Sequence, residues 1–263
     1  MPYADLGDFK LYYEEHGVGE PLIFLHGFSL DRRMWTPQIP YFKTSYRVIL
    51  PDAKGHGESD APPTAYSRAD RVNDLLQLAD ILEIERFHLV GLSMGGSTAL
   101  GFALAHQHRL RSLTLVSTGA AGYSAGRRFT RLDEVGRAEG AEAAKEQWMQ
   151  WSLAWYRESA RAHIRPLIEE MMRGYSGAVW KDKMRGKYDK EQDLERVHTI
   201  DTPTFILAGA LDRIFLPLAR LLHAKIAGSQ LSVYEQTGHM INLEQPDRFN
   251  RDLSAFLAAR AVS

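Results

Sequence analysis

The sequence predicts an α/β fold, in which helices cover both faces of a mostly parallel, twisted β-sheet and a helical segment is inserted into the chain. Short apolar runs recur along the first half, separated by segments whose apolar residues have helical spacing. That alternation is typical of parallel sheets with helical cover. Hydrophobic residues make up 44% of the chain and charged residues 25%, which is ordinary for a globular protein. The length of 263 residues suits one large α/β domain with an insertion.

Seven short runs are predicted to be the strands. Several are apolar at consecutive positions, as expected for parallel strands that are buried on both faces. The runs are residues 10–13, 22–25, 47–50, 87–90, 113–116, 204–207 and 230–234.

Residues 69–82 form the clearest predicted helix, because their apolar side chains recur at spacings of three and four. The other predicted helices of this part are residues 97–105 and 246–259.

The middle of the chain differs from both ends. Between about 119 and 202 the helical pattern continues and no run resembles a strand. We therefore predict an α/β core formed by residues 1–120 and 201–263, and an inserted helical cap formed by residues 121–200.

Charge and cysteine content exclude several classes of function. Lys plus Arg is 32 and Asp plus Glu is 33, so nucleic acid and anionic membranes exert no net attraction on the chain. The absence of cysteine removes disulfides, thiolate metal ligands and a cysteine nucleophile. The first residues lack the basic segment and apolar run of a secretory signal, and no apolar run approaches the roughly 20 residues that cross a bilayer. We expect a cytoplasmic protein that binds neither nucleic acid nor membranes.

A Gly-x-Ser-x-Gly pattern directly follows the predicted strand 87–90. Residues 91–96 read GLSMGG and a predicted helix comes next, so Ser93 lies on a strand-to-helix turn. On so sharp a turn the serine takes a strained conformation, and glycine at positions 91 and 95 avoids collisions. The hydroxyl is then presented near the positive end of the following helix, where developing negative charge is stabilised. The pattern alone is weak evidence, but its place in the fold makes Ser93 the candidate nucleophile.

Two ionisable residues follow later predicted strands. Asp212 lies on the loop after 204–207, and His239 lies on the loop after 230–234. The carboxyl ends of parallel strands are where open sheets assemble their sites, and the order Ser, acid, His is the order used with such a turn. The loop after 113–116 offers no carboxylate. The sequence therefore predicts a catalytic triad of serine, aspartate and histidine.

Two backbone N–H groups are candidates for an oxyanion hole. The early strand ends in a tight turn that can aim the N–H of Phe28, and Met94 follows the candidate nucleophile directly. Two such donors would stabilise the negative oxygen of a tetrahedral intermediate.

Several segments, taken in order, resemble the α/β-hydrolase fold family with a helical cap. They are HGF at 26–28, Trp35, PDAKGHGES at 51–59, GLSMGG at 91–96, GALD at 209–212 and GHM at 238–240. The resemblance covers essentially the whole predicted core. It implies that Ser93 is the nucleophile, that His239 is the base and then the acid, and that Asp212 orients the imidazole.

A narrower resemblance concerns the substrate. The run HGFSLDRRMW, the GLSMGG turn and the STGA segment at 117–120 are similar to 3-oxoadipate enol-lactonases and to cofactor-free haloperoxidase-like esterases. It implies a serine esterase or lactonase that cleaves a small carboxylic ester or lactone without a metal or an organic cofactor. The sequence has no phosphate-binding loop and no H-E-x-x-H zinc motif.

Other functions stay open. Carbon–carbon bond hydrolases use the same triad, but as a family they tend to show a glycine- and proline-rich oxyanion segment and Asn before the serine. This chain has Ser29, Leu30 and Leu92 at those places. A cofactor-free perhydrolase or haloperoxidase would use the triad unchanged, and a ligand-binding receptor on the same fold can keep an intact triad. Haloalkane dehalogenases and epoxide hydrolases use an Asp nucleophile, which Ser93 argues against.

Cap side chains are the candidates for a substrate pocket. Trp148, Trp151 and Trp155 repeat at spacings of three and four, which first of all predicts the packed face of an amphipathic helix. A helical layer above the nucleophile must also wall the cavity. We expect one or two of these tryptophans to line it, together with Met240 on the core.

Other polar residues are assigned structural or solvent-facing roles. His26 and His56 lie in glycine-rich turns and are expected to support the site rather than to react. Cap arginines could anchor a substrate carboxylate, but we expect them to be solvated. They are Arg127, Arg128, Arg131 and Arg173.

Overall fold

The computed structural model describes residues 2–123, 127–157, 164–182 and 192–259, with the backbone alone described at 127–130 and 153–157. Its strands are β1 Tyr3–Asp5, β2 Lys10–His16, β3 Glu20–Leu25, β4 Tyr46–Pro51, β5 Phe87–Leu92, β6 Leu110–Val116, β7 Thr204–Gly209 and β8 Gln230–Tyr234. Its α-helices are α1 Ile39–Phe42, α2 Arg68–Ile81, α3 Met94–His106, α4 Arg127–Ala138, α5 Ala141–Arg157, α6 Arg165–Gly174, α7 Ala178–Lys181, α8 Asp193–Arg196, α9 Phe215–Lys225, α10 Ile241–Glu244 and α11 Pro246–Ala258. Short 3-10 helices are η1 Arg32–Trp35, η2 Gln107–Arg109 and η3 Val197–Thr199.

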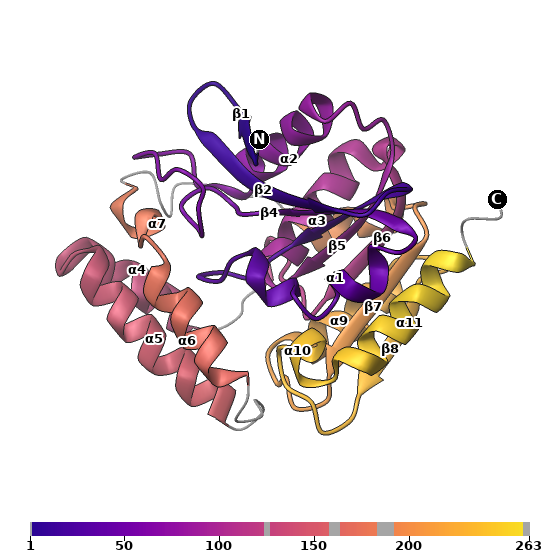
Figure 1. Ribbon diagram of the computed structural model, residues 1–263. Coiled ribbons are helices and arrows are strands. Elements are labelled where there is room, and N and C mark those ends of the chain that lie inside the picture. The colour runs from indigo at the N-terminus through magenta and orange to yellow at the C-terminus, as the bar shows by residue number, and fades with distance from the viewer. Residues whose placement is uncertain (1, 124–126, 158–163, 183–191, 260–263) are drawn as a thin grey trace.

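The strands form one twisted sheet in the order β1-β2-β4-β3-β5-β6-β7-β8 (Figure 1). β4, β3 and β5 to β8 run parallel to one another, and only β1 and β2 at one edge pair antiparallel. This confirms the predicted α/β fold with a mostly parallel sheet. Each predicted run lies within an observed strand, and β1 is an additional strand that the sequence did not predict.

Strand β3 shows why the sheet needs cover on both faces. Leu22 and Phe24 belong to one apolar cluster, whereas Ile23 and Leu25 belong to another, because successive side chains of a strand point to opposite faces. Helices α2, α3 and α9 cover the face of Ile23 with Val72, Leu75, Ala79, Ala99, Leu100, Ala103, Leu218 and Leu222. Helices α1 and α11 cover the opposite face with Phe42, Phe249, Leu253 and Leu257.

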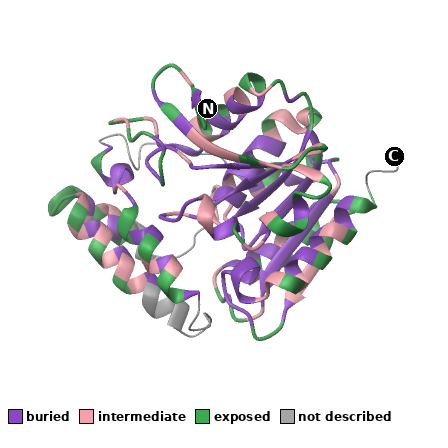
Figure 2. Ribbon diagram, viewed as in Figure 1, coloured by how far each residue is buried: buried purple, intermediate pink, exposed green. Residues whose placement is uncertain are grey.

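The described residues between β6 and β7 form helices and no strand. Helices α4, α5 and α6 lie side by side at one side of the sheet (Figure 1). Their buried side chains, such as Leu132, Ile168 and Met172, belong to the same cluster as α1 and α11. In Figure 2 these helices carry buried, intermediate and exposed residues side by side, whereas the central strands are largely buried. In the described residues the cap consists of helices joined by short turns and loops, without a strand. Its exact limits at 121 and 200 stay a prediction.

Across the described ranges, no helix combines the length and the apolar character needed to cross a membrane. The same residues include no group of three or more His, Cys, Asp or Glu side chains that could hold a metal ion.

Candidate active site

Ser93 lies between the last residue of β5 and the first residue of α3, in a backbone conformation that L residues rarely adopt. Its φ is 56° and its ψ is −108°, and such strain persists only where the surrounding structure enforces it. A Cβ at position 91 would overlap the Gly95 carbonyl oxygen, and one at 95 would overlap the Leu25 carbonyl oxygen. Glycine at both positions is therefore a steric requirement of the turn, as the sequence predicted.

The three predicted triad residues follow strands at the same edge of the sheet. Ser93 follows β5, Asp212 follows β7 and His239 follows β8, and β5 to β8 are consecutive parallel neighbours. The backbone N–H of Ser93 donates to the Val116 carbonyl at 3.0 Å. The N–H of Leu211 donates to the Thr237 carbonyl at 2.9 Å, which ties the loop of Asp212 to the loop of His239.

Asp212 and His239 form a buried hydrogen bond. Asp212 Oδ2 lies 2.7 Å from His239 Nδ1, and the two residues are 0% and 2% exposed. An ionised carboxylate only accepts, so Nδ1 carries the proton and Nε2 of the neutral ring is the acceptor. The other carboxylate oxygen, Oδ1, accepts the N–H groups of Ile214 at 3.3 Å and Phe215 at 3.1 Å. This second set of bonds fixes the carboxylate so that Oδ2 faces the imidazole.

The loop after β3 lies beside the strained turn. A Cβ built on Gly27 would lie 3.7 Å from the Cβ of Ser93. The Gly27 carbonyl accepts the N–H of Leu30 at 3.2 Å and lies 2.8 Å from His26 Nδ1. Because a trans peptide points its C=O and N–H in opposite directions, these bonds turn the N–H of Phe28 the other way.

Neither predicted oxyanion donor has a backbone acceptor among the described residues. Met94 is the first residue of α3, and the first N–H groups of a helix have no partner within it. The N–H of Phe28 and the N–H of Met94 thus remain available for an oxyanion, as their predicted role requires.

A comparison with families of known proteins agrees with the observed fold and with the geometry of the site. The family model described as "alpha/beta hydrolase fold" matches residues 20–246. The chain belongs to the alpha/beta hydrolase fold family. Members of this family use the Gly-x-Ser-x-Gly elbow and the chain order Ser, acid, His found here, and the chain is accordingly a hydrolase.

Three similar proteins illustrate the range of reactions on this hydrolase fold. A 3-oxoadipate enol-lactonase of Acinetobacter baylyi is 28% identical, and the match covers 90% of this chain and 88% of that protein. A 2-hydroxy-6-oxo-6-phenylhexa-2,4-dienoate hydrolase of Comamonas testosteroni is 30% identical over 97% of this chain and 94% of its own. The solved structure of a thermophilic esterase of Thermogutta terrifontis is 29% identical, covers 98% of this chain and 96% of its own, and gives a TM-score of 0.84.

The cap of the hydrolase contacts the loop that carries Phe28, whose N–H is the first predicted oxyanion donor. The Phe28 ring packs edge-on against Trp148, Tyr175 and Trp180, with ring centroids 5.3, 5.3 and 5.5 Å apart. Trp148 Nε1 also donates to Ser29 Oγ at 2.7 Å. Sequence reasoning used only the backbone of Phe28 and missed this contact, because its partners lie more than a hundred residues away in the chain.

The predicted pocket residues have different environments. Trp148 is buried and Trp151 is partly buried against the same cluster. Met240 is buried in that cluster as well. The side chain of Trp155 lies outside the described residues. Whether any of the four contacts substrate stays a prediction.

Among the cap arginines, Arg131 and Arg173 are exposed, which matches the expectation that they are solvated. The side chains of Arg127 and Arg128 lie outside the described residues.

His26 and His56 have the structural roles that the sequence suggested. His26 is buried, and its Nε2 accepts the N–H of Ala53 at 2.8 Å while Nδ1 donates to the Gly27 carbonyl. Its ring therefore connects the loop after β3, which carries Gly27 and Phe28, to the segment after β4. The His56 ring packs 4.5 Å from Tyr175. Burial, and then the neighbouring His26, lowers the pKa of His56 well below its usual range, so this ring is neutral near pH 7.

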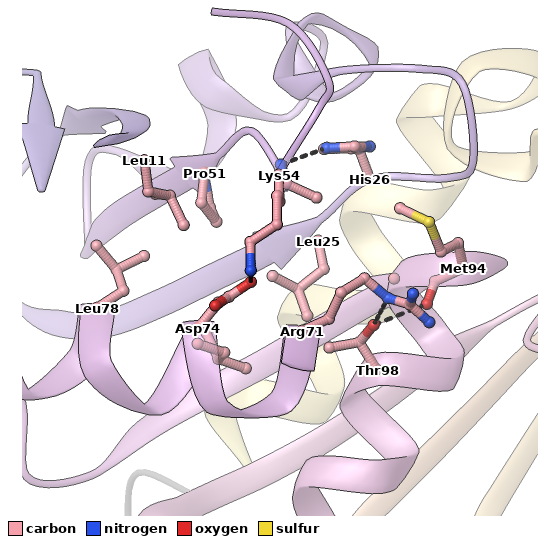
Figure 3. Close-up of a pocket in the computed structure, with 13 residues that line it drawn as sticks. Leu11, Leu25, His26, Pro51, Lys54, Arg71, Asp74, Leu78, Met94 and Thr98 are labelled. Atoms are coloured by element: carbon pink, nitrogen blue, oxygen red, sulfur yellow. Dashed lines mark hydrogen bonds and ion pairs between the residues drawn. The ribbon is translucent and has the colours of Figure 1, made fainter. Parts of the chain in front are cut away.

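A small cavity of about 40 Å³ lies between α2, α3 and the end of β3 (Figure 3). Arg71 Nε donates to Thr98 Oγ1 at 3.0 Å along its wall, and Met94 closes one end. Lys54 and Asp74 form a buried ion pair across it, with Nζ and Oδ2 3.4 Å apart. The lining includes none of the triad residues. Its volume holds only a few water molecules, so we assign it no substrate.

The buried carboxyl group of Asp74 in this cavity predicts that the stability of the protein depends on pH. Burial raises the pKa of Asp74 from 3.8 to about 6, although the Lys54 ammonium opposes the rise. Between these values the folded protein binds a proton more readily than the unfolded chain, so the contribution of Asp74 to stability falls as pH rises. Asp74→Asn removes this titration. We expect the wild type to lose up to about 3 kcal/mol relative to the variant between about pH 4 and pH 7.

Urea unfolding of both proteins at several pH values measures this difference. Parallel curves of unfolding free energy against pH for the two proteins would contradict the assignment.

Proposed function

We propose that the protein is a serine hydrolase that cleaves a small carboxylic ester or lactone through an acyl-enzyme on Ser93. The observation that carries the proposal is the buried 2.7 Å bond between Asp212 and His239, on the sheet edge where the strained Ser93 also lies. A serine is a weak nucleophile unless an oriented base takes its proton.

The proposed reaction has two acyl transfers. His239 Nε2 takes the proton of Ser93 as Oγ attacks the ester carbonyl, and the resulting oxyanion accepts the N–H groups of Phe28 and Met94. The carbon–oxygen bond to the alcohol then breaks, and His239 returns the proton to the departing alkoxide. Water, deprotonated by His239, attacks the acyl-enzyme, and release of the carboxylic acid restores Ser93. Asp212 holds the imidazole tautomer and stabilises the imidazolium in each step.

The substrate class rests on two of the similar proteins. One is named an enol-lactonase and the other an esterase. The dienoate hydrolase relative supports carbon–carbon bond cleavage as a second candidate. The Ser29-Leu30 segment and Leu92 before the nucleophile disfavour that candidate. The proposed partner is thus a small molecule, and no step needs a cofactor.

A panel of chromogenic short-chain esters, simple lactones and a 2-hydroxy-6-oxo-dienoate tests the substrate class. We expect turnover of at least one ester or lactone at a higher kcat/KM than the dienoate. Preference for the dienoate would establish the second candidate. No turnover on the whole panel would favour a ligand-binding protein.

The proposed oxyanion hole predicts a role for His26. His26→Ala removes the ring that holds the Gly27 carbonyl, so the N–H of Phe28 loses its fixed direction. Because loss of one oxyanion donor costs about 10²- to 10³-fold in kcat, we expect a loss of about 10- to 100-fold with KM nearly unchanged. Steady-state kinetics on the best ester measures it.

His88→Ala is the matched control for this prediction. His88 is also buried, but it bonds Ser112 Oγ and Glu20 near the amino ends of the parallel strands, whereas the triad residues follow their carboxyl ends. Equal losses of kcat in the two variants would show that destabilisation, not the loop after β3, is responsible.

A further inference from the structure

A buried carboxylate that the proposed mechanism does not use lies against the loop of His239. Glu244 is the last residue of α10 and is 2% exposed. Its Oε2 accepts the N–H of Gly238 at 2.9 Å, and its Oε1 accepts the N–H of Met240 at 3.2 Å. One side chain therefore bridges the backbone N–H groups of Gly238 and Met240, the residues before and after His239.

The burial of the Glu244 carboxylate needs compensating hydrogen bonds. Burial of an ionised carboxylate is strongly unfavourable unless hydrogen bonds or an opposite charge compensate. Here each oxygen accepts a separate N–H, which is the behaviour of an ionised carboxylate rather than of a protonated acid. Hydrogen bonds to a charged acceptor are also about twice as strong as neutral ones.

Other contacts hold the rest of the loop. Gln245 Nε2 donates to the Glu235 carbonyl at 3.0 Å and to Thr237 Oγ1, and the Phe215 ring packs 4.9 Å from the His239 ring. The loop has no regular secondary structure between β8 and α10, and Gln236 within it has a φ of 54°. On the side of Asp212, the Thr237 carbonyl accepts the N–H of Leu211 at 2.9 Å. The Gly238 carbonyl approaches Gly209 so closely that a Cβ there would overlap it. Glu244 adds bonds to the N–H groups of the residues directly before and after His239.

We propose that Glu244 is the positioning residue of His239: it fixes the backbone on both sides of the imidazole so that Nδ1 stays on Asp212 while Nε2 serves Ser93. The proposal rests on the proposed function of Ser93 and His239. Glu244 acts through the backbone, by its bonds to the N–H groups of Gly238 and Met240. Misplacement of a catalytic group by about 1 Å can cost about 10²-fold in rate.

Glu244→Gln tests the bridge with a side chain of equal size. The amide oxygen can accept one of the two N–H groups, but the amide nitrogen is a donor that faces the other N–H. We expect kcat on the best ester to fall about 10- to 100-fold, with KM within about twofold of the wild type. Glu20→Gln is the matched control, because Glu20 also bonds a histidine, His88 Nε2 at 3.2 Å, near the opposite end of the sheet.

A signal that needs no substrate separates this proposal from the proposed function. The Nδ1 proton of His239 bound to Asp212 gives a low-field proton NMR resonance, which is assigned by its loss in His239→Ala. We expect Glu244→Gln to broaden or shift this resonance and Glu20→Gln to leave it unchanged. Reaction of Ser93 with a fluorophosphonate probe reports the nucleophile independently of the natural substrate.

The outcomes are distinct. A wild type that neither cleaves esters nor reacts with the probe overturns the proposed function, and the resonance then decides on Glu244 alone. Wild-type kcat and an unchanged resonance in Glu244→Gln overturn the proposal. If that variant does not fold, Glu244→Asp replaces it, because the charge remains but the shorter side chain cannot reach both N–H groups. A lower kcat with unchanged KM then supports the proposal, and wild-type kcat overturns it.

Discussion

Ser93→Ala is expected to lower kcat for ester hydrolysis by about 10⁴- to 10⁶-fold, the loss seen when the nucleophile of such a unit is removed. Alanine has no oxygen to form the acyl-enzyme, while the hydrogen bond of Asp212 to His239 and the donors at Phe28 and Met94 stay in place. Residual turnover above the uncatalysed rate would come from those donors and from binding alone. Steady-state kinetics on the best ester, with the fluorophosphonate probe as a second readout, measures the loss.

Ser112→Ala is the matched control for this variant. Ser112 is a buried serine on β6 whose Oγ lies 2.8 Å from His88 Nδ1 near the opposite end of the sheet. Its loss costs about 1 kcal/mol of stability and leaves kcat within about twofold. Ester turnover that survives in Ser93→Ala would remove Ser93 from the role of nucleophile and require another residue on that edge of the sheet.

The site residues that the sequence predicted share one property. Each could be placed from its position relative to the neighbouring predicted strand or helix along the chain. Ser93 lies between an apolar run and a helix, with glycines that the turn requires. Asp212 and His239 each lie on the loop that follows a predicted strand. Because parallel strands bring their carboxyl ends to one edge, the order of elements was enough to bring the two loops together.

Glu244 could not be found in this way. It lies in the run INLEQP, just before the predicted helix 246–259, where an acid normally predicts only a favourable interaction with the dipole of that helix. Its contact with Gly238 and Met240 depends on how the short helix α10 folds back on the loop. Glu244 lies five residues after His239. This spacing matches neither the helical nor the strand period, so no pattern in the sequence links the two residues.

The packing of Phe28 was also hidden, for a different reason. Its ring meets Tyr175 and Trp180, and these contacts depend on where the cap docks on the core. Amphipathic spacing shows that a cap helix has an apolar face but does not identify the surface that covers it. Strand β1 was missed because only Ala4 of its three residues is buried, so no alternation was visible.

Asp212→Asn is expected to lower kcat by about 10⁴-fold at neutral pH while the protein stays folded. Asp212 Oδ1 already accepts the N–H groups of Ile214 and Phe215, and the oxygen of an asparagine can keep those bonds. The amide nitrogen must then take the place of Oδ2 against His239 Nδ1. A donor at that position favours the tautomer with the proton on Nε2, which cannot accept the proton of Ser93.

In Asp212→Asn, the amide nitrogen that faces His239 changes the tautomer of the imidazole. This effect can be distinguished from the loss of the Asp212 charge. Asp252→Asn is the control, since Asp252 accepts the Tyr234 hydroxyl at 2.7 Å and has no part in the proposed reaction; its kcat should stay within about twofold. In Asp212→Asn the low-field Nδ1 proton resonance of His239 should disappear, because the proton moves to Nε2. A variant that loses kcat but keeps that resonance would show that Asp212 acts through its charge and not by selecting the tautomer.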